Sequence, residues 1–387
     1  MAHTFSVAFA TGSRAEYGIV RKYLRLLDQD EHISLSILVT GALLSEKYAH
    51  QVELIYKDGF RIEAELDIEM DSSSNATISH SMALALEKFS KLFALKKYDL
   101  LIILGDRFEM LSVATAAAME RIPILHIHGG EATFGNYDEF IRHCITKMAT
   151  YHFTATDEYR RRVIQLGENP DTVFYLGSLG AENCLNINEA VVSDEIKNLK
   201  DSEYFVVLFH PETLTGVRTL TQINELLSAI ERFPGYRFVF LGTNADTYSD
   251  IIRNRVSEFV ASHSNSVYFE NLPSEGYHYL VKQSKGLIGN SSSGLIEAPS
   301  LGVLTVNIGD RQAGRVRGNS VIDVECNQFA IERAIKKMIR SPMNKDIINP
   351  YFRSDAASNY YSKTVSLLET VESDTRYPKR FYDCCSK

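Results

Sequence analysis

The chain has 387 residues, which is long for one domain and comfortable for two. Apolar residues make up 45% and charged residues 23%, a composition that excludes a collagenous, low-complexity or largely disordered chain. The net charge of -8 argues against a general nucleic-acid binder, which needs a basic surface, but it leaves room for a local basic pocket that binds a small anion.

The cysteines and the apolar runs indicate the cellular compartment of the protein. The five cysteines are scattered and include no CxxC pair, which is typical of reduced thiols in a cytoplasmic protein. No stretch approaches the ~20 apolar residues of a membrane span, and the first residues lack the charged start and apolar core of a signal peptide. We therefore expect a cytoplasmic protein without a membrane or nucleic-acid partner.

Short β-branched or aromatic runs alternate with segments of helical period, a pattern typical of parallel sheets covered by helices. In the first half we predict the strands Phe5–Ala10, Leu35–Thr40, Leu100–Leu104, Ile124–Ile127 and Phe153–Thr156, and the helices Ile19–Leu27, Ile78–Leu95, Phe108–Met119 and Glu139–Met148. In the second half we predict the strands Tyr204–Phe209, Arg237–Leu241, Val267–Phe269, Gly286–Ile288 and Val303–Asn307, and the helices Leu220–Arg232, Thr247–Ala261, Glu275–Lys282, Leu295–Ser300 and Phe329–Ile339. The polar stretch Ala181–Lys200 is the expected linker, and a last helix near Ala357–Glu372 is expected to pack back on the first domain.

Several predicted strands end in glycine or another small residue followed by polar groups. These strand ends read ATGSR from Ala10, LGDR from Leu104, HIHGGE from His126, LGT from Leu241 and IGNSSSG from Ile288. In open α/β sheets, ligands bind outside the carboxyl ends of the strands. Glycine that simply makes a βα turn explains any one of these sites but not the polar residues at all of them, so we predict one cleft between two such domains.

The segment Gly289–Gly294 offers serine hydroxyls and backbone N–H groups to an anion, because it lies between a predicted strand and a short helix. Glu297, one turn further on, is placed to accept the hydroxyls of a ribose. Leu295 and Ile296 replace the Lys-Ser/Thr pair of a Walker loop, and the chain contains no GxGxxG segment. The alternative reading is an ordinary helix N-cap made of serines.

A second basic feature contains Arg311, Arg315 and Arg317, just after another predicted strand end. Arginine forks suit phosphate oxygens, and a solvated surface loop is the alternative. Arg14, at the end of the first predicted strand, adds a cation from the other domain. A diphosphate in the predicted cleft would use both sides.

Three acids are candidates for proton transfer. Asp106 and Glu131 follow neighbouring predicted strands, where two carboxylates brought together would push one pKa up. A helix N-cap is the alternative reading for Asp106 and also for Asp138, which precedes a helix that carries Arg142.

The histidines offer further candidates. His126 and His128 are two residues apart in an extended segment and face the same way, but no third ligand with convincing spacing completes a metal site. We predict one buried structural histidine and one site histidine. His210, which follows a strand, is placed to bind or protonate a phosphate leaving group.

Together these segments resemble the hydrolysing UDP-N-acetylglucosamine 2-epimerases of sialic-acid biosynthesis. The motifs that carry the resemblance are TGSRAEYG, GDRFEML, HIHGGEATFGNYDEFIRHCITKM, FHPET, IGNSSSGLIEAPSLG and VNIGDRQAGR. The resemblance implies an α/β protein with the GT-B fold, in which two Rossmann-like, doubly wound domains face a central cleft. We place these domains at residues 1–182 and 183–365, with a C-terminal helix at about 366–387 packed back on the first.

The resemblance also implies which residues act. Catalysis would involve Asp106, Glu131, Asp138, His128 and His210. The UDP-sugar would be bound by Arg14, Arg107, Arg142, His210, Gly242, Asn290, Ser291, Ser292, Ser293, Gly294, Glu297 and Arg311. Several relatives carry a glutamate at the position of His128, so that role falls here to His128, to Glu131 or to both.

The expected reaction converts UDP-N-acetylglucosamine to N-acetylmannosamine and UDP, the first step of sialic-acid biosynthesis. It needs no metal and no redox cofactor, and the resemblance suggests a homodimer or homotetramer. The alternatives are the same reaction on UDP-2,4-diacetamido-2,4,6-trideoxyglucose, a non-hydrolysing 2-epimerase, and a retaining glycosyltransferase that uses a UDP-sugar. A sensor that binds a nucleotide sugar without turnover fits less well, because the acids and histidines would then have no role.

Overall fold

Contacts divide the chain into two compact units. The computed structural model describes residues 4–46, 50–134, 137–212, 219–243, 248–341, 346–370 and 379–384. The first unit comprises Met1–Glu131, Asp138–Leu179 and Arg353–Lys387, and the second comprises Ala132–Tyr137 and Gly180–Phe352. The chain thus returns to the first unit at Arg353, earlier than the predicted position 366. Arg353 already contacts the first unit there, since its Nη1 donates to the Tyr175 carbonyl at 3.0 Å.

In the first unit, the described residues form a seven-stranded parallel sheet in the order β3-β2-β1-β4-β5-β6-β7. Its strands are β1 (Phe5–Thr11), β2 (Ile33–Thr40), β3 (Ile62–Leu66), β4 (Leu100–Leu104), β5 (Ile124–Ile127), β6 (Tyr151–Thr154) and β7 (Val173–Tyr175). The helices are α1 (Arg14–Asp28), α2 (Glu53–Lys57), α3 (Asn75–Leu95), α4 (Phe108–Met119), α5 (Asp138–Met148), α6 (Asp157–Gln165), α7 (Leu179–Asn183, which leads into the second unit) and α14 (Ala356–Thr370), with 3-10 turns at Gly41–Leu43 and Pro170–Thr172.

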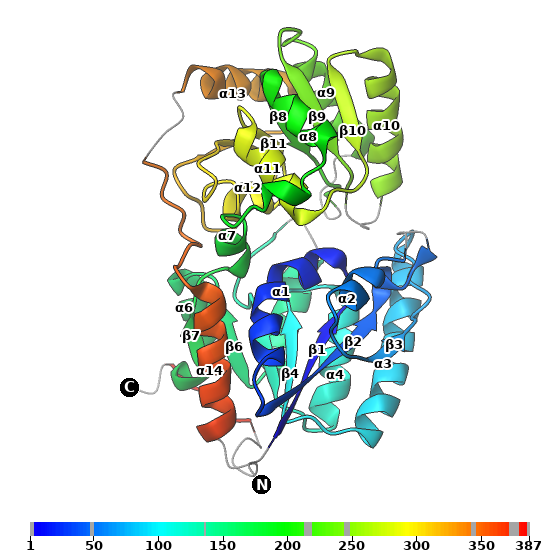
Figure 1. The fold of residues 1–387 in the computed structure, drawn as a ribbon, viewed down its shortest axis with the longest axis vertical. Helices are drawn as coiled ribbons and strands as arrows, with labels where there is room; N and C mark the ends of the chain where they lie inside the picture. The colour runs from blue at the N-terminus through cyan, green and yellow to red at the C-terminus, as the bar shows by residue number, and fades with distance from the viewer. Residues whose placement is uncertain are drawn as a thin grey trace. The chain divides into compact units, whose positions relative to one another are not determined.

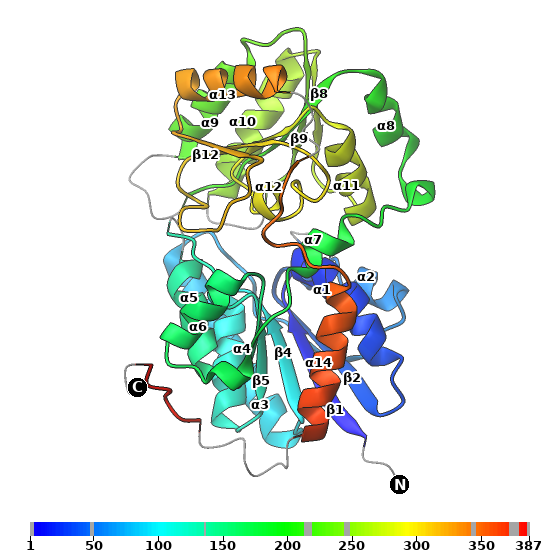
Figure 2. The same cartoon turned by 90° about the vertical axis from the view of Figure 1, so that its left-hand side faces the viewer.

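Helices cover both faces of this sheet (Figures 1 and 2). Val7 and Phe9 of β1 join the core formed with α1 and α14, where the hydroxyl of Tyr23 lies 2.7 Å from that of Thr364. Ala8 and Ala10 are equally buried and point to the other face, because successive strand residues alternate. That face is covered by α3, α4 and α5, which pack side by side.

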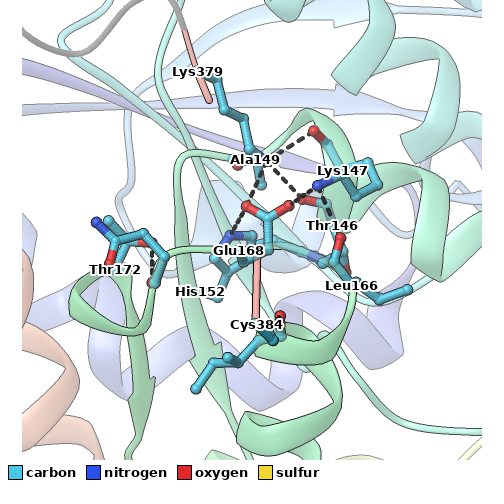
Figure 3. A network of polar contacts seen from close by, with 12 residues as sticks. Thr146, Lys147, Ala149, His152, Leu166, Glu168, Thr172, Lys379 and Cys384 are labelled. Atoms are coloured by element: carbon cyan, nitrogen blue, oxygen red, sulfur yellow. Dashed lines mark hydrogen bonds and ion pairs between the residues drawn. The ribbon is translucent and has the colours of Figure 1, made fainter. Parts of the chain in front are cut away.

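The C-terminal segment 379–384 lies against α5 and α6, held by a buried charge network (Figure 3). The Glu168 carboxylate accepts hydrogen bonds from Lys147 Nζ at 2.5 Å and from Lys379 Nζ at 2.7 Å, and it lies 3.1 Å from His152 Nε2. Burial raises the pKa of Glu168, but the hydrogen bond to His152 and the two lysines outweigh it and hold that pKa at about 2. Burial lowers the pKa of Lys379 to about 8.

Lys379 also connects this segment to the end of α5. It donates to the last carbonyl oxygens of the helix, those of Thr146 at 3.2 Å, Lys147 at 2.8 Å and Ala149 at 2.5 Å. A cation at a helix C-terminus is stabilising because it satisfies carbonyls that have no partner within the helix. The other end of α5 carries Asp138 and Arg142, so the segment holds a helix that contributes to the candidate site.

In the second unit, the described residues form a six-stranded parallel sheet in the order β10-β9-β8-β11-β12-β13. Its strands are β8 (Tyr204–Leu208), β9 (Arg237–Leu241), β10 (Ser266–Phe269), β11 (Leu287–Gly289), β12 (Thr305–Ile308) and β13 (Val321–Val324). The helices are α8 (Asp194–Lys197), α9 (Thr219–Ile230), α10 (Ser249–Ser262), α11 (Ser274–Gln283), α12 (Ser293–Ile296) and α13 (Gln328–Arg340), with 3-10 turns at Glu189–Val191 and Asn198–Asp201. The α9, α10 and α13 helices pack on one face of the sheet, and α8 and α11 pack on the other.

Each predicted strand and all but one of the predicted helices appear in the structure with shifted ends at most. The exception is the helix predicted at Leu295–Ser300, where the structure has the shorter α12 followed by turns. Residue 247 and residues 371–372 of two predicted helices lie outside the described residues. The predicted fold of two doubly wound α/β domains is confirmed. The predicted linker Ala181–Lys200 is more ordered than expected. It contains two short helical turns and α8, and its apolar side chains Val192, Ile196 and Leu199 are buried in the core of the second unit. Because this stretch contains few apolar residues, its sequence did not indicate this packing. In the described part of the chain, no helix combines the length and apolarity that crossing a membrane requires.

Candidate active site

The candidate residues flank the switch point of each sheet. The strand order reverses between β1 and β4 in the first unit and between β8 and β11 in the second. Open α/β sheets bind ligands at such a point, outside the carboxyl ends of the strands. Gly12–Arg14 follows β1 and Gly105–Arg107 follows β4, while His210 follows β8 and Asn290 follows β11. The topology therefore gathers the candidates of each unit at one edge of its sheet.

A charge network lies at this edge of the first unit. The Arg142 side chain is fully buried, and its Nη2 donates to the Asp106 carboxylate. Its Nη1 donates to the Glu131 carbonyl at 3.0 Å and to the Glu139 carboxylate at 3.3 Å. A buried guanidinium requires such partners, because desolvation of an unpaired charge costs several kcal/mol. Asp106 is therefore an ion-pair partner and not an N-cap, since α4 begins at Phe108 and its cap position, Arg107, makes no side-chain capping bond.

Asp138 lies on the same helix face as Arg142. The α5 helix begins at Asp138 itself, so this residue occupies the first turn rather than a position that precedes it. Residues four apart on a helix are neighbours, which brings the Asp138 side chain next to that of Arg142. Glu139 binds both Arg142 and, at 3.3 Å, His143. Sequence reasoning missed Glu139, although its spacing to Arg142 was a readable signal.

His128 and Glu131 form a buried pair. His128 Nδ1 lies 3.6 Å from Glu131 Oε1, and the two residues are 8% and 2% exposed. His128 has φ +66°, a left-handed conformation that costs a residue with a side chain about 1 kcal/mol. Gly130 follows with φ +80°, where a Cβ atom would overlap the Tyr159 carbonyl oxygen. The HIHGGE turn thus requires glycine and holds the histidine beside the glutamate.

His126 is the structural histidine that the sequence predicted. Its side chain is fully buried, and its two nitrogens lie 3.1 Å from the Thr146 hydroxyl and 2.8 Å from the Gly105 carbonyl oxygen. Burial lowers its pKa to about 3, so it remains neutral at physiological pH. It connects the turn after β4 with α5. No group of three metal-ligating side chains occurs among the described residues.

The turn that carries Arg14 begins α1. Ser13 and Glu16 form a capping box, in which the Glu16 carboxylate accepts the N–H groups of Gly12 at 2.9 Å and Ser13 at 3.0 Å. Burial lowers the pKa of Arg14. Arg107 Nε donates to the fully buried Glu109 carboxylate at 2.6 Å. Our sequence reasoning missed both glutamates, although the Ser-x-x-Glu spacing was visible.

In the second unit, Asn290 is a clamp across the switch point. Its side-chain oxygen accepts the N–H of His210 at 2.7 Å, and its side-chain nitrogen donates to the His210 carbonyl at 2.8 Å. Its own carbonyl accepts Arg311 Nη1 at 3.3 Å and Gln312 Nε2 at 2.8 Å. The side chain of Asn290 thus fixes the His210 backbone, and Gln312 is a further member that sequence reasoning missed.

The serine loop makes an internal network. The Ser293 hydroxyl donates to the Glu297 carboxylate at 2.7 Å and contacts the Tyr277 hydroxyl, and the Ser293 N–H donates to the Ser291 hydroxyl at 3.4 Å. Ser292 occupies the cap position of α12 without a side-chain capping bond, which does not support the reading as an ordinary serine cap. Since α12 has four residues, the expected contribution of a helix dipole shrinks to that of one turn.

Two glycines allow close backbone packing. At Gly294 a Cβ atom would lie 2.6 Å from the Thr305 methyl, and the Gly294 carbonyl accepts the Thr305 hydroxyl at 2.8 Å. At Gly242 a Cβ atom would overlap the Glu270 carbonyl oxygen, and the Gly242 N–H donates to the Phe269 carbonyl at 2.9 Å. Both glycines therefore shape the strand ends, and the Gly242 N–H already has a partner.

Two of the three arginines after β12, Arg311 and Arg317, have different roles. Arg311 is 9% exposed and donates to the Asn290 carbonyl, so it belongs to the network of the switch point. Arg317 pairs with Asp323, at 2.7 Å from Nε to Oδ2, and donates to the carbonyls of Arg315 and Gln312. Arg317 therefore stabilises its own loop.

Comparisons with known proteins identify the family. The sequence profile of the family UDP-N-acetylglucosamine 2-epimerase matches residues 25–363, and the chain belongs to this family. It is 47% identical to the polysialic acid biosynthesis protein P7 of Escherichia coli, over 97% of each chain. It is 35% identical to the hydrolysing GDP/UDP-N,N'-diacetylbacillosamine 2-epimerase of Campylobacter jejuni, over 97% of this chain and 98% of the relative. Its fold matches the crystal structure of UDP-GlcNAc 2-epimerase from Neisseria meningitidis bound to UDP-GlcNAc, with a TM-score of 0.79, 17% identity, and 93% and 100% of the two chains covered.

Proposed function

We propose that the protein is a hydrolysing 2-epimerase that converts UDP-N-acetylglucosamine and water to N-acetylmannosamine and UDP. The observation that carries this proposal is the buried charge network of the first unit, in which Arg142 binds Asp106 and the backbone of Glu131, next to His128. Carboxylates and an imidazole held together at the ends of β4 and β5 supply the groups that proton transfer to and from carbon needs.

The substrate dictates the order of steps. The C2–H bond of the sugar has no neighbouring carbonyl, so a carboxylate cannot remove that proton at a useful rate. The C1–O bond to UDP therefore breaks first, and its electron pair leaves with the diphosphate. The oxocarbenium ion that develops acidifies C2–H, and a carboxylate takes this proton to give a 2-acetamidoglucal. Water then adds its oxygen to C1, and a proton returns to C2 from the other face.

We assign the proton transfers to Asp106, Glu131 and Asp138, assisted by His128 and His210. The pairing of His128 with Glu131 supports a shared role at the position where relatives carry a glutamate. A carboxylate beside an imidazole stabilises its protonated form, which is useful when a proton is passed on.

We assign the nucleotide to the second unit, where His210, Arg311 and the loop Asn290–Gly294 supply cations and donors for a diphosphate. In the first unit, Arg14 and Arg107 are the cations that we propose for the UDP-sugar. Glu297 is assigned to the ribose, and Gly242 to a close backbone approach. The fold shared with an epimerase crystallised with UDP-GlcNAc supports this assignment.

One relative supports the plain N-acetyl sugar and another supports the diacetamido sugar. The relative at 47% identity is named for polysialic acid biosynthesis, whereas the diacetylbacillosamine 2-epimerase is 35% identical. The second candidate reaction is therefore the same elimination and hydration on UDP-2,4-diacetamido-2,4,6-trideoxyglucose, favoured by that second relative.

One experiment tests the reaction and its alternatives. The protein is incubated in heavy water with each of the two UDP-sugars, and the products are followed by NMR. We expect free N-acetylmannosamine with deuterium at C2 from UDP-N-acetylglucosamine. Turnover of the diacetamido sugar alone would favour the second candidate, and an epimer still attached to UDP would indicate a non-hydrolysing enzyme. Absence of C2 deuteration with both sugars would contradict the mechanism.

The assignment of Asp106 predicts a separation of turnover from binding. Asp106→Asn keeps the size of the side chain and a hydrogen-bond acceptor for Arg142 but removes the acid. We expect kcat to fall about 10²- to 10⁴-fold, the usual share of a general acid or base, with UDP affinity within about twofold. Isothermal titration with UDP and the NMR assay measure the two quantities. Asp157→Asn, at an exposed acid of α6, is the control that should change neither. An Asp106→Asn enzyme that turns over normally would remove Asp106 from the mechanism.

A further inference from the structure

Both carboxylate oxygens of Glu212 accept hydrogen bonds from neighbouring parts of the second unit. Its Oε1 accepts the backbone N–H groups of Asp310 at 2.8 Å and Arg311 at 3.1 Å. Its Oε2 accepts Gln222 Nε2 of α9 at 2.9 Å. The residue is 5% exposed, so these bonds form away from bulk water. A charged acceptor makes hydrogen bonds roughly twice as strong as a neutral one, and a single oxygen here secures two consecutive backbone donors.

The turn after β12 is shaped to receive this carboxylate. Gly309 has φ +75°, and a Cβ atom at this position would overlap Glu212 Oε1. The Gly309 N–H donates to the Val324 carbonyl at 2.8 Å, which fixes the start of the turn against β13. A turn with a side chain at 309 could not approach the carboxylate so closely. The position of the Glu212 carboxylate therefore requires glycine at position 309.

The turn fixes the backbone position from which the Arg311 side chain extends. The Arg311 N–H bond to Glu212 fixes its backbone, and its Nη1 donates to the Asn290 carbonyl at 3.3 Å. Asn290 in turn clamps His210, two residues before Glu212. Without the carboxylate, two backbone donors would lose their acceptor, and the Arg311 N–H is buried, where an unsatisfied donor costs about 1–3 kcal/mol. The turn would rearrange to recover these bonds, and Arg311 would move with it.

We propose that Glu212 is a positioning residue for substrate binding, which holds the Gly309–Arg311 turn so that the Arg311 guanidinium meets the diphosphate of the nucleotide. This inference rests on the proposed function, in which Arg311 binds that diphosphate. Glu212 acts through the turn, since both of its carboxylate oxygens accept hydrogen bonds from the protein. It acts on the binding of the nucleotide, whereas the acids assigned to proton transfer, Asp106, Glu131 and Asp138, lie outside this turn.

Three variants test this role. Glu212→Ala removes both acceptors, and Glu212→Gln retains one oxygen that can still accept the two backbone N–H groups. Glu225→Ala is the matched control, because Glu225 also lies on the second unit and accepts one backbone N–H, that of Gln328 at 2.6 Å. Both glutamates are near Cys326, whose thiol pKa is raised to about 12 by burial first and then by Glu212 and Glu225. The control therefore removes a similar charge and bond from the same region but leaves the arginine turn intact.

The measurements are the Kd for UDP by isothermal titration, KM and kcat for UDP-N-acetylglucosamine, and the melting temperature of each variant. We expect Kd and KM to rise about tenfold or more in Glu212→Ala and about threefold or less in Glu212→Gln, with kcat changed less than about threefold in both. Glu225→Ala should lower the melting temperature without changing Kd. Equal Kd values for Glu212→Ala and the wild type would overturn the inference, as would an equal loss of affinity in Glu225→Ala. Absence of UDP binding by the wild type would instead contradict the proposed function.

Discussion

Two arginine-bearing turns, Thr11–Arg14 in the first unit and Gly309–Arg311 in the second, are anchored by the same device from different parts of the chain. In each turn, two consecutive backbone N–H groups donate to one glutamate oxygen, at 2.9 and 3.0 Å for Glu16 and at 2.8 and 3.1 Å for Glu212. Glu16 follows its turn within the first helical turn of α1, whereas Glu212 precedes Asp310 by 98 residues. The two turns thus have the same hydrogen-bond geometry. In the first unit the glutamate is close to the turn in sequence, and in the second unit it is distant in sequence and is brought to the turn by the fold.

The two anchors differ in their electrostatic surroundings. Burial, and then the neighbouring Glu109 carboxylate, raise the pKa of Glu16 to about 7, although Arg107 opposes the shift. The second oxygen of Glu212 instead accepts a neutral amide from Gln222 at 2.9 Å. A titration near neutral pH is therefore expected at the turn of the first unit. The Glu212 carboxylate is in addition fitted against Gly309, so its role is steric and directional.

Gly309→Ala breaks the tertiary anchor and should have the largest effect. The added Cβ atom displaces the Glu212 carboxylate, and alanine is also strained in the left-handed conformation at φ +75°. We expect the free energy of unfolding to fall by about 3 kcal/mol, the sum of about 1 for the backbone and about 2 for the lost bonds. UDP affinity should fall about tenfold with it. Urea denaturation and titration with UDP measure the two changes.

Gly302→Ala is the control for this prediction. Gly302 also has φ +75° and lies in the second unit, but a Cβ atom there would meet nothing within 4 Å. It should therefore cost only the backbone share of about 1 kcal/mol and leave UDP affinity unchanged. Equal effects of the two substitutions would show that the contact with Glu212 carries no free energy.

Glu16→Gln sharpens the comparison by removing the titration and keeping the capping box, in which glutamine also functions. An acid whose pKa is raised in the folded state binds its proton more tightly there than in the unfolded chain. The wild type therefore loses stability as the pH rises from about 4.5, the ordinary value, through about 7. We expect the stability of the variant relative to the wild type to rise by about 2 kcal/mol between pH 5 and about pH 8.

Thermal melting at several pH values measures this difference. The exposed acid Glu158, in the first turn of α6, provides the control, since Glu158→Gln should keep the pH profile of the wild type. A variant of Glu16 with the same pH profile as the wild type would show that the buried carboxylate does not titrate in this range.

The sequence predicted every interior strand of both sheets and the edge strand β10, and it missed the other three edge strands. β4, with its run LLIIL, was predicted to the residue because a strand buried on both faces is apolar throughout. β3, β7 and β13 were missed, and each of them lies at an edge of its sheet. Edge strands are short or carry polar residues on their exposed faces, as in IEAEL of β3, so their pattern does not stand out.

The sequence placed the candidate residues at strand ends but did not reveal how they are paired. A carboxyl end of a parallel strand is recognisable from polar residues after an apolar run, which is how Asp106, after a glycine, and His210 were found. The clamp from Asn290 to His210 depends on β8 and β11 being neighbours, and the anchor from Glu212 depends on where the turn after β12 lies. Such pairings follow from strand order and cannot be read from spacing along the chain.

Arg317→Ala should have the smallest effect. It tests whether the contribution of an arginine to UDP binding depends on its place in the hydrogen-bond network rather than on its charge alone. Arg317 and Arg311 belong to one basic loop in the sequence, but Arg317 pairs with the half-exposed Asp323 and with carbonyls of its own loop. Exposed ion pairs contribute about 0.2–1 kcal/mol, so we expect a loss of stability in that range. UDP affinity should remain within about twofold, whereas Arg311→Ala should weaken it at least about tenfold, because a charge-assisted bond to phosphate is lost. Titration with UDP distinguishes the two variants, and equal losses of affinity would mean that the loop acts through its total charge.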